Sequence, residues 1–310
     1  MRKVLFATTA LVALGGVSAA SADISVAGSA SHNFVSGSGD GTYATDSQSM
    51  STTVDFGLSG SSTLDNGMTV AGGIDLDEGG YDDSGWTITG DFGTLAFGGY
   101  ASDSFGAMSV DVTADEGHGG FTSTTTSTTE YVDTLPGDNY IGHSDISLAL
   151  PAVSGVSIMI GYGDGTTDDN NSSFGGVSYA MDAGDMTVTV AYAKQSTGGS
   201  SADNDQMAAK IAAGDATVTM ISGNKGDYSN TGIGVTYALS DSLSVQAYTG
   251  SVELDTNSAY EVKDTGFGAT YTITPGMSMS LTSNSYTGKD GTAANAEEGT
   301  TTTLALDVTF

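Results

Sequence analysis

The sequence predicts an all-β fold, a transmembrane antiparallel β-barrel of about sixteen strands, and three observations lead to this prediction. Apolar and polar residues alternate along segments of the length that a tilted membrane strand requires. The connections between these segments are short and long in turn. An export signal precedes the first segment. After that signal, no stretch shows the 3.6-residue repeat of a helix.

The first 22 residues have the composition of a cleavable signal peptide. Arg2 and Lys3 form a basic start, an uncharged apolar stretch follows over residues 4–17, and Ala20-Ser21-Ala22 forms a small-residue cleavage site. The apolar stretch is too short to span a bilayer comfortably, which argues against a membrane anchor. We therefore expect residues 1–22 to be removed on export and residues 23–310 to form a single barrel domain.

The final segment shows the alternation most clearly. Leu304, Leu306, Val308 and Phe310 share one face, whereas Asp307 lies on the other. Fifteen earlier segments alternate in the same way, and in chain order their apolar positions span residues 24–30, 54–58, 68–76, 86–88, 95–97, 146–150, 156–162, 177–181, 186–192, 207–211, 216–220, 233–239, 243–247, 267–273 and 277–281. A soluble β-sandwich would alternate too, so alternation alone does not decide between the two folds.

The connections favour the barrel. Every second one is a tight turn rich in Gly, Asn and Asp, which supply the positive φ angles of short hairpins. These turns lie at residues 65–67, 90–93, 151–155, 182–185, 213–215, 240–241 and 274–276. The connections between them are longer and more acidic, at residues 37–48, 78–84, 164–171, 196–203, 225–228, 254–259 and 288–298. Short turns at one end and long loops at the other are typical of an outer-membrane barrel, whereas a sandwich has no reason to keep that order.

The charge and composition exclude several classes of function. Without the signal, the only arginine is lost and five lysines remain against 37 acidic residues, a net charge of −32. Such a chain repels nucleic acid and attracts cations. It contains no cysteine, so disulfides and thiolate metal sites are excluded. The three histidines are scattered and no nucleophile elbow, zinc signature or phosphate loop occurs, so we expect no enzyme.

One connection breaks the length rule. Residues 102–138 separate the fifth and sixth segments, and connections of this length in compact folds are usually functional or disordered. The stretch just before it, Trp86 to Gly98 (WTITGDFGTLAFG), resembles the strand-turn-strand that precedes the constriction loop in the porins of alphaproteobacteria. The resemblance continues through His143-Ser144-Asp145-Ile146-Ser147-Leu148 and ends at the aromatic residue Phe310. That family consists of sixteen-stranded general diffusion porins.

The resemblance implies a function, a location and partners. It implies a homotrimer in the bacterial outer membrane, in contact with its lipid, in which each barrel is a water-filled channel for passive diffusion of small hydrophilic solutes and ions. It further implies that the long third loop, residues 102–138, folds into the pore and narrows it. Phe310 would be recognised by the barrel-insertion machinery, as the terminal Phe of that family is.

The chain departs from the family pattern in its charges. Such porins usually set an acidic third loop against Arg and Lys on the opposite wall. Here only Lys210 among the lysines falls clearly on an inward position, so we expect an all-acidic constriction that favours cations. The carboxylates expected to line it are those of Asp111, Asp115, Glu116, Glu130 and Asp133. A solvated loop whose charges simply lie in water is the alternative.

A second acidic run offers hard oxygen ligands that could bind calcium weakly. It consists of Asp75, Asp77, Glu78, Asp82 and Asp83. The run lacks the spacing of known calcium loops, which favours a solvated loop, and no other cofactor is expected. An alternative function of another class is a secreted acidic surface protein that assembles through calcium. A chelator alone should release such a protein, whereas a porin should fractionate with outer membranes and require detergent.

Overall fold

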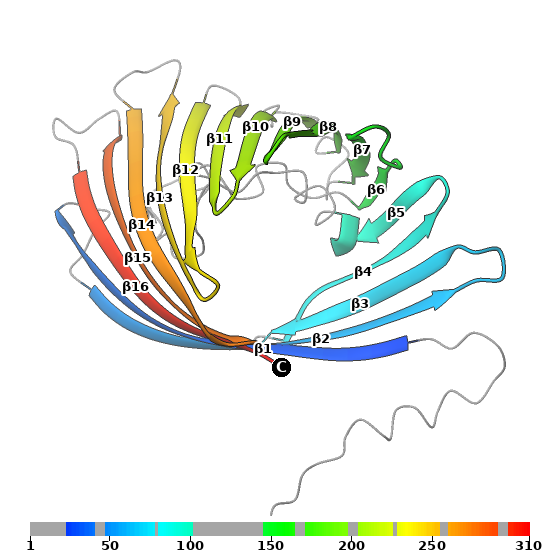
Figure 1. Cartoon of the computed structure of the whole chain (residues 1–310), viewed down its shortest axis with the longest axis horizontal. Helices are drawn as coiled ribbons and strands as arrows, with labels where there is room; N and C mark the ends of the chain where they lie inside the picture. The colour runs from blue at the N-terminus through cyan, green and yellow to red at the C-terminus, as the bar shows by residue number, and fades with distance from the viewer. Residues whose placement is uncertain are drawn as a thin grey trace, which may run out of the picture.

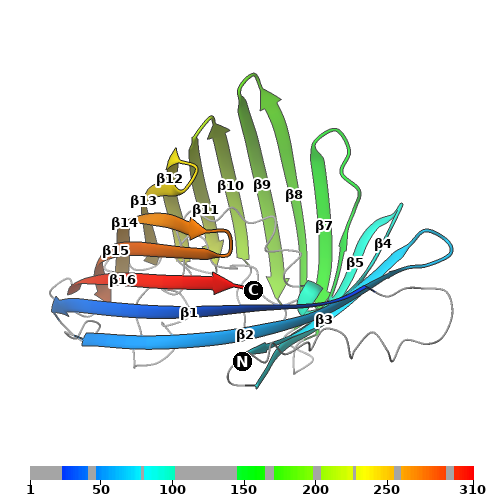
Figure 2. The ribbon, with the colours of Figure 1, turned by 60° about the horizontal axis from the view of Figure 1, so that its bottom comes forward.

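The computed structural model describes residues 23–40, 47–77, 80–101, 145–164, 171–197, 204–225, 228–254, 260–290 and 297–310 of the chain. In these ranges sixteen strands form one closed barrel, in which each strand pairs antiparallel with its neighbours in the sequence (Figure 1). The ring closes where β1 pairs with β16, the blue and red strands that lie side by side in Figure 2. The predicted sixteen-stranded antiparallel barrel is confirmed.

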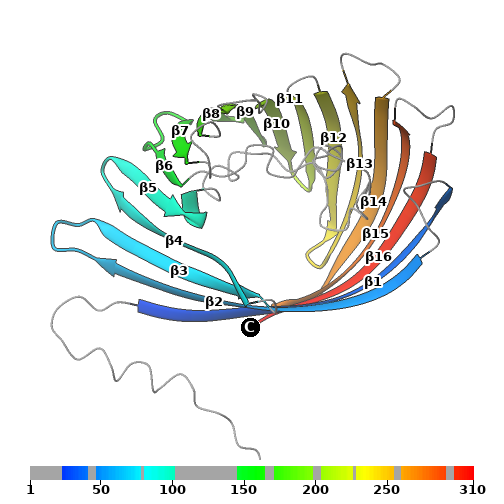
Figure 3. The same ribbon diagram turned by 180° about the vertical axis from the view of Figure 1, so that it is seen from behind.

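The strands follow one another in chain order around the ring, as the view from behind in Figure 3 also shows. Their bounds are β1 Asp23–Asp40, β2 Ser47–Thr63, β3 Thr69–Asp77, β4 Gly80–Gly90, β5 Gly93–Gly98, β6 Ile146–Ala149, β7 Val156–Gly163, β8 Ser172–Ala183, β9 Met186–Thr197, β10 Asn204–Ala213, β11 Ala216–Lys225, β12 Tyr228–Ser240, β13 Leu243–Leu254, β14 Tyr260–Thr274, β15 Met277–Asp290 and β16 Glu297–Thr309. Among the described residues, no helix is long and apolar enough to cross a membrane.

The tight turns lie at one end of the barrel, which we call the turn end, and the opposite end is the loop end. Two-residue turns join β8 to β9 and β10 to β11, and each contains a glycine with positive φ, Gly184 at 70° and Gly214 at 57°. Left-handed backbone of this kind costs glycine nothing and other residues about 1 kcal/mol or more. The predicted Gly-rich turns are therefore where hairpins form.

The strands run further toward the loop end than the hydrophobic pattern predicts. β1 has 18 residues and β2 has 17, whereas a tilted membrane strand requires about 9 to 11. The connection expected at residues 37–48 is accordingly shorter, because β1 continues to Asp40 and β2 begins at Ser47. Likewise, β4 begins at Gly80 inside the connection expected at residues 78–84. These extensions are mostly Ser, Thr and Gly on both faces, so no apolar alternation marks them.

The two faces of the wall differ as the alternation predicts. Large apolar side chains such as Phe267, Ile233 and Leu304 are exposed on the outer surface, where they form the apolar belt of a membrane barrel. The inward positions carry mainly hydroxyl, amide, carboxylate and glycine residues. At the closure, the N–H of Gly28 donates to the carbonyl oxygen of Phe310 at 2.8 Å, and the N–H of Phe310 donates back at 2.9 Å. The Phe310 ring also meets Phe56 edge-on, with centroids 6.0 Å apart.

Candidate functional site

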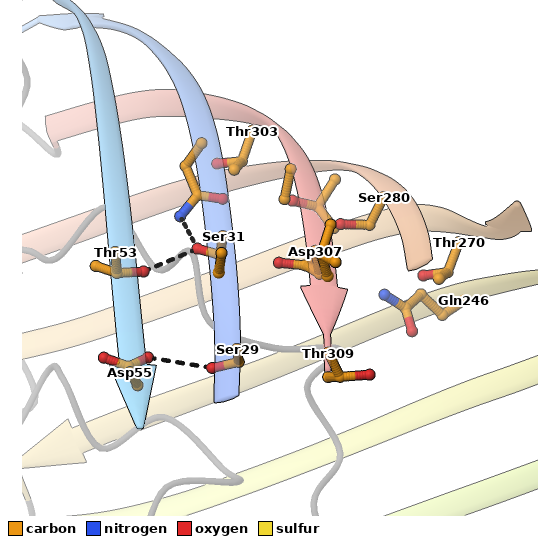
Figure 4. Close-up of a pocket in the computed structure, with 15 residues that line it drawn as sticks. Ser29, Ser31, Thr53, Asp55, Gln246, Thr270, Ser280, Thr303, Asp307 and Thr309 are labelled. Carbon is orange, nitrogen blue, oxygen red and sulfur yellow. Dashed lines mark hydrogen bonds between the residues drawn. The ribbon is translucent and has the colours of Figure 1, made fainter. Parts of the chain in front are cut away.

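The inner wall of the barrel is a hydroxyl-rich surface along β13 to β16, β1 and β2. It borders a cavity of about 550 Å³, into which Ser29, Ser31, Thr53, Asp55, Thr303 and Asp307 point (Figure 4). No basic and no aromatic residue lines this cavity. The wall therefore offers oxygen atoms and negative charge to whatever passes along it.

Hydrogen bonds across neighbouring strands fix the side chains of this wall. Ser29 Oγ donates to Asp55 Oδ2 at 3.4 Å, and the hydroxyls of Ser31 and Thr53 are 3.0 Å apart (Figure 4). Asn33 Nδ2 donates to Ser31 Oγ at 3.4 Å. In the strand register, Ser31 lies opposite Asp307 on β16 and Ser29 lies opposite Asp55 on β2. The two carboxylates thus lie on either side of β1, each next to a serine.

The balance of charge on the inner wall is acidic. The inward-facing carboxylates among the described side chains include those of Asp55, Asp75, Asp182, Asp264 and Asp307. Lys210 on β10 faces inward and is exposed, and the strand register places Lys225, at the end of β11, on the same face of the wall. Lys194 and Lys263 share the outward face with Tyr192 and Phe267, respectively. Because the sixteen strands follow chain order, β10 lies across the ring from β2.

One inward carboxylate is buried rather than solvated. Asp264 on β14 is 4% exposed, and Tyr248 Oη donates to its Oδ2 at 2.9 Å. Thr249 Oγ1 donates to its backbone oxygen at 3.1 Å. Gly266 makes room for this arrangement, because a Cβ there would overlap the Tyr248 ring and lie 2.6 Å from Asn284 Oδ1. The sequence analysis missed this cluster, although continuing the alternation of Phe267 and Ala269 backward along β14 would have placed Asp264 inward.

The predicted constriction carboxylates lie outside the described residues. Asp111, Asp115, Glu116, Glu130 and Asp133 all fall within residues 102–144. Their placement in the pore stays a prediction.

The predicted calcium run lies partly in strands. Asp75 faces inward on β3, with its Oδ1 2.9 Å from where a Cβ on Gly57 would lie, and Asp83 is its register partner on β4. Asp77 and Asp82 also belong to β3 and β4, and Glu78 lies outside the described residues. Within the ranges that the structure describes, no three His, Cys, Asp or Glu side chains gather as a metal site.

A backbone hydrogen bond ties together the two ends of the third connection, where it leaves β5 and returns to β6. After β5 ends at Gly98, residues 99–101 form a turn of helix that lies inside the ring (Figure 1). The N–H of Gly98 donates to the carbonyl oxygen of Asp145 at 3.0 Å, which ties the outgoing chain to the returning chain. Gly98 has φ of 68°, and a Cβ there would lie 2.5 Å from the backbone oxygen of Ser84.

Several inward side chains on the wall from β5 to β11 are buried, in contrast to the exposed Asp55. Ser147 is 2% exposed, and Met159 and Phe174 pack against each other. Further along the wall, Ala208 packs against Ile221. Three polar inward side chains there, those of Gln195, Gln206 and Thr219, are buried as well. Buried inward side chains also occur on β14 to β16, at Asp264, Asn284 and Thr301, whereas Asp55 on β2 and Lys210 on β10 are exposed.

Residues 7–291 match the family of Gram-negative porins. The chain is similar to the anion-selective porin from Comamonas acidovorans, at 14% identity and a TM-score of 0.67, with 93% of this chain and 100% of that chain covered. It is similar to the trimer form of OmpT from Vibrio cholerae, at 13% identity and a TM-score of 0.65, with 93% and 99% covered. A mutant porin of Rh. blastica is 18% identical, with a TM-score of 0.64 and 93% and 100% covered. No curated protein matches the sequence.

At such identities the solved structures show a shared fold alone, and it is the family match that shows the family. That match spans most of the chain, and the closed sixteen-stranded barrel with a polar lumen agrees with it. The chain therefore belongs to the Gram-negative porins, which are non-enzymatic channels of the outer membrane.

Proposed function

We propose that this porin is a cation-favouring channel for passive diffusion of small hydrophilic solutes and ions. The observation that carries the proposal is the charge of the inner wall, where Asp55, Asp75 and Asp307 face the lumen and basic residues are few, namely Lys210 and, by register, Lys225. Carboxylates that line a pore raise the local concentration of cations and lower that of anions. The mature chain, at −32 without arginine, cannot supply a broad basic wall against them.

The fold does not decide the sign of the selectivity. The porin from Comamonas acidovorans shares the barrel and is described as anion-selective. The sign must therefore come from the side chains of each lumen, and here those are acidic.

The proposal includes a constriction formed by the third connection, residues 102–138, folded into the pore. Two features of the described residues support it. The turn of helix after Gly98 lies on the inner side of the wall, and Ala101 at its end is fully buried. Inward side chains on several strands, such as Gln206 on β10, Thr219 on β11 and Asn284 on β15, are buried although they face a lumen. A chain segment folded into the lumen would account for both.

The charge part of the proposal is tested by neutralisation. Replacing Asp111→Asn, Asp115→Asn and Glu116→Gln together should lower cation selectivity, and so should Asp55→Asn with Asp307→Asn. Glu253→Gln, on the outer face of β13, is the matched control and should leave selectivity unchanged. Reversal potentials in planar bilayers give the comparison. Unchanged selectivity in both the triple and the double variant would contradict an acidic filter. A loss of selectivity in the Asp55 and Asp307 variant alone would show that the filter lies on the wall and not in the third connection.

We further propose that the protein is a homotrimer, and the ground for this is a polar pair of side chains in the apolar belt. His32 Nδ1 and Thr52 Oγ1 are 2.7 Å apart on the outer face of β1 and β2. In register, His32 lies opposite Leu306, and its outward neighbours Phe34 and Val54 are apolar. Hydrocarbon cannot satisfy an imidazole, whereas a neighbouring subunit can. The trimer form of the Vibrio cholerae porin is consistent with this assembly.

The remaining expectations stay proposals. They are removal of residues 1–22 as a signal peptide, contact with outer-membrane lipid, recognition of Phe310 by the barrel-insertion machinery, membership of the alphaproteobacterial branch, and weak calcium binding near Asp75. The family membership favours a channel over the secreted calcium-dependent surface protein. Fractionation separates the two, because a porin stays with the outer membrane after chelation and needs detergent for release.

A further inference from the structure

The turn of helix that opens the third connection is seated in a notch of the inner wall. Its central residue, Tyr100, lies over two neighbouring strands at inward positions that have no side chain, Gly73 on β3 and Gly85 on β4. The alternation with outward Ile74 and Trp86 places both glycines on the lumen side. The notch is thus formed by residues that come before β5 and are separate from the connection itself.

The fit of Tyr100 in this notch is close. A Cβ on Gly73 would overlap Tyr100 Oη. A Cβ on Gly85 would lie 2.6 Å from the backbone nitrogen of Tyr100 and 2.8 Å from its Cβ. Real Cβ atoms do not approach other heavy atoms this closely, so a larger residue at Gly85 would displace the turn and one at Gly73 would displace the Tyr100 side chain.

The hydrogen bond at Gly98 and the notch at Gly73 and Gly85 together fix the chain between β5 and Ala101. Gly98, with φ of 68°, bends the chain away from β5, and its N–H is held by the carbonyl of Asp145. Tyr100 then lies against β3 and β4, which is back across the lumen face rather than out into solvent. Two anchors within three residues therefore hold residues 98–100 against the lumen face of the wall.

We propose that Tyr100, seated over Gly73 and Gly85, is a positioning residue that sets where the third connection enters the pore and hence how wide the pore is. The proposal rests on the constriction proposed above. The Tyr100 side chain reaches from Gly85, beside its backbone and Cβ, to Gly73, beside its Oη, and so fills the space left by two absent side chains. Losing it frees the first turn of the connection while the barrel strands and their hydrogen bonds remain.

The test uses Tyr100 rather than the glycines, because a Cβ at Gly73 or Gly85 would also lie 2.7 Å from a backbone oxygen of the barrel. The variants are Tyr100→Ala and the conservative Tyr100→Phe, with Tyr192→Ala, on the outer face of β9, as a matched loss of one ring. A fourth variant replaces residues 103–137 by a short Gly-Ser linker. Single-channel conductance and open-channel noise are measured in planar bilayers, and heat-modifiable migration on gels reports the folded barrel.

Tyr100→Ala should shift the conductance and raise the open-channel noise more than Tyr100→Phe, which keeps the ring in the notch, whereas Tyr192→Ala should resemble the unmodified protein. The linker variant should conduct more than all of them. If the linker variant conducts more but Tyr100→Ala behaves like the unmodified protein, the positioning role of Tyr100 is contradicted while the proposed constriction is retained. If the linker variant conducts no more than the unmodified protein, both are overturned. A Tyr100→Phe channel as disturbed as Tyr100→Ala would also overturn the role of the ring.

Discussion

At the scale of single residues, the face on which a side chain lies decides the cost of a charge. Val235 and Thr236 are neighbours on β12, with Val235 in the outer apolar belt and Thr236 on the lumen side. Val235→Arg should destabilise the barrel by about 2–4 kcal/mol, because the guanidinium would be placed in hydrocarbon. Thr236→Arg should cost far less, because its charge stays in water. Urea unfolding in lipid vesicles measures both, and equal costs would show that the faces are assigned wrongly.

The alternation of single residues predicts the two faces well, and it predicts the site only in part. Asp307 lines the lumen cavity and Leu304 is exposed on the outside, which confirms the faces predicted for the last strand. The buried pair of Asp264 and Tyr248 was missed, because the loop-end half of β14 lacks the apolar partners that reveal a strand. The carboxylates from Asp111 to Asp133 stay predictions, because a pattern of charge in a long connection carries no information about where the connection lies.

At the scale of elements, the turn glycines are the most demanding positions. Gly93 ends the Gly-Asp-Phe-Gly turn between β4 and β5, with φ of 110°, and a Cβ there would overlap the backbone oxygen of Ala149 on β6. Gly93→Ala should therefore destabilise the barrel by about 1–3 kcal/mol or more. Gly175→Ala is the control, because nothing lies within 3.9 Å of a Cβ there, and it should change stability by less than about 0.5 kcal/mol. A harmless Gly93→Ala would contradict the account of this motif.

The number and order of the strands could be predicted from the sequence, whereas their lengths could not. Tight turns and apolar alternation are local signals, and they locate each membrane-spanning part of β1 to β16. Beyond the bilayer, both faces of a strand meet water, so hydrophobicity no longer alternates and the pattern fades. The residues that extend β1 to Asp40 and begin β2 at Ser47 are of this kind. Pairing with β2 keeps β1 in register as far as Gly37 opposite Ser47, and pairing with β16 continues to Asp40.

At the scale of the whole molecule, the proposed trimer predicts which outer side chain matters for assembly. His32→Ala should lower the temperature at which the oligomer dissociates in detergent, because it removes the polar side chain in the apolar belt that a neighbouring subunit would satisfy. Ile233→Ala, on the outer face of β12, five strands from β1 around the ring, removes an apolar side chain of similar size and should not lower that temperature. Semi-native gels measure the transition. Equal behaviour of the two variants would remove the support that His32 gives to the trimer.

The central claim is that an acidic lumen makes this porin favour cations, and the reversal potential of the unmodified protein tests it most directly. In a planar bilayer under a KCl gradient, the sign of this potential gives the preferred ion. The account predicts a cation preference that is strongest at low salt. It should weaken as the Debye length falls from about 30 Å at 0.01 M to about 3 Å at 1 M. An anion preference, or a cation preference that does not change with salt concentration, would contradict a selectivity set by Asp55, Asp307 and the other carboxylates of the lumen.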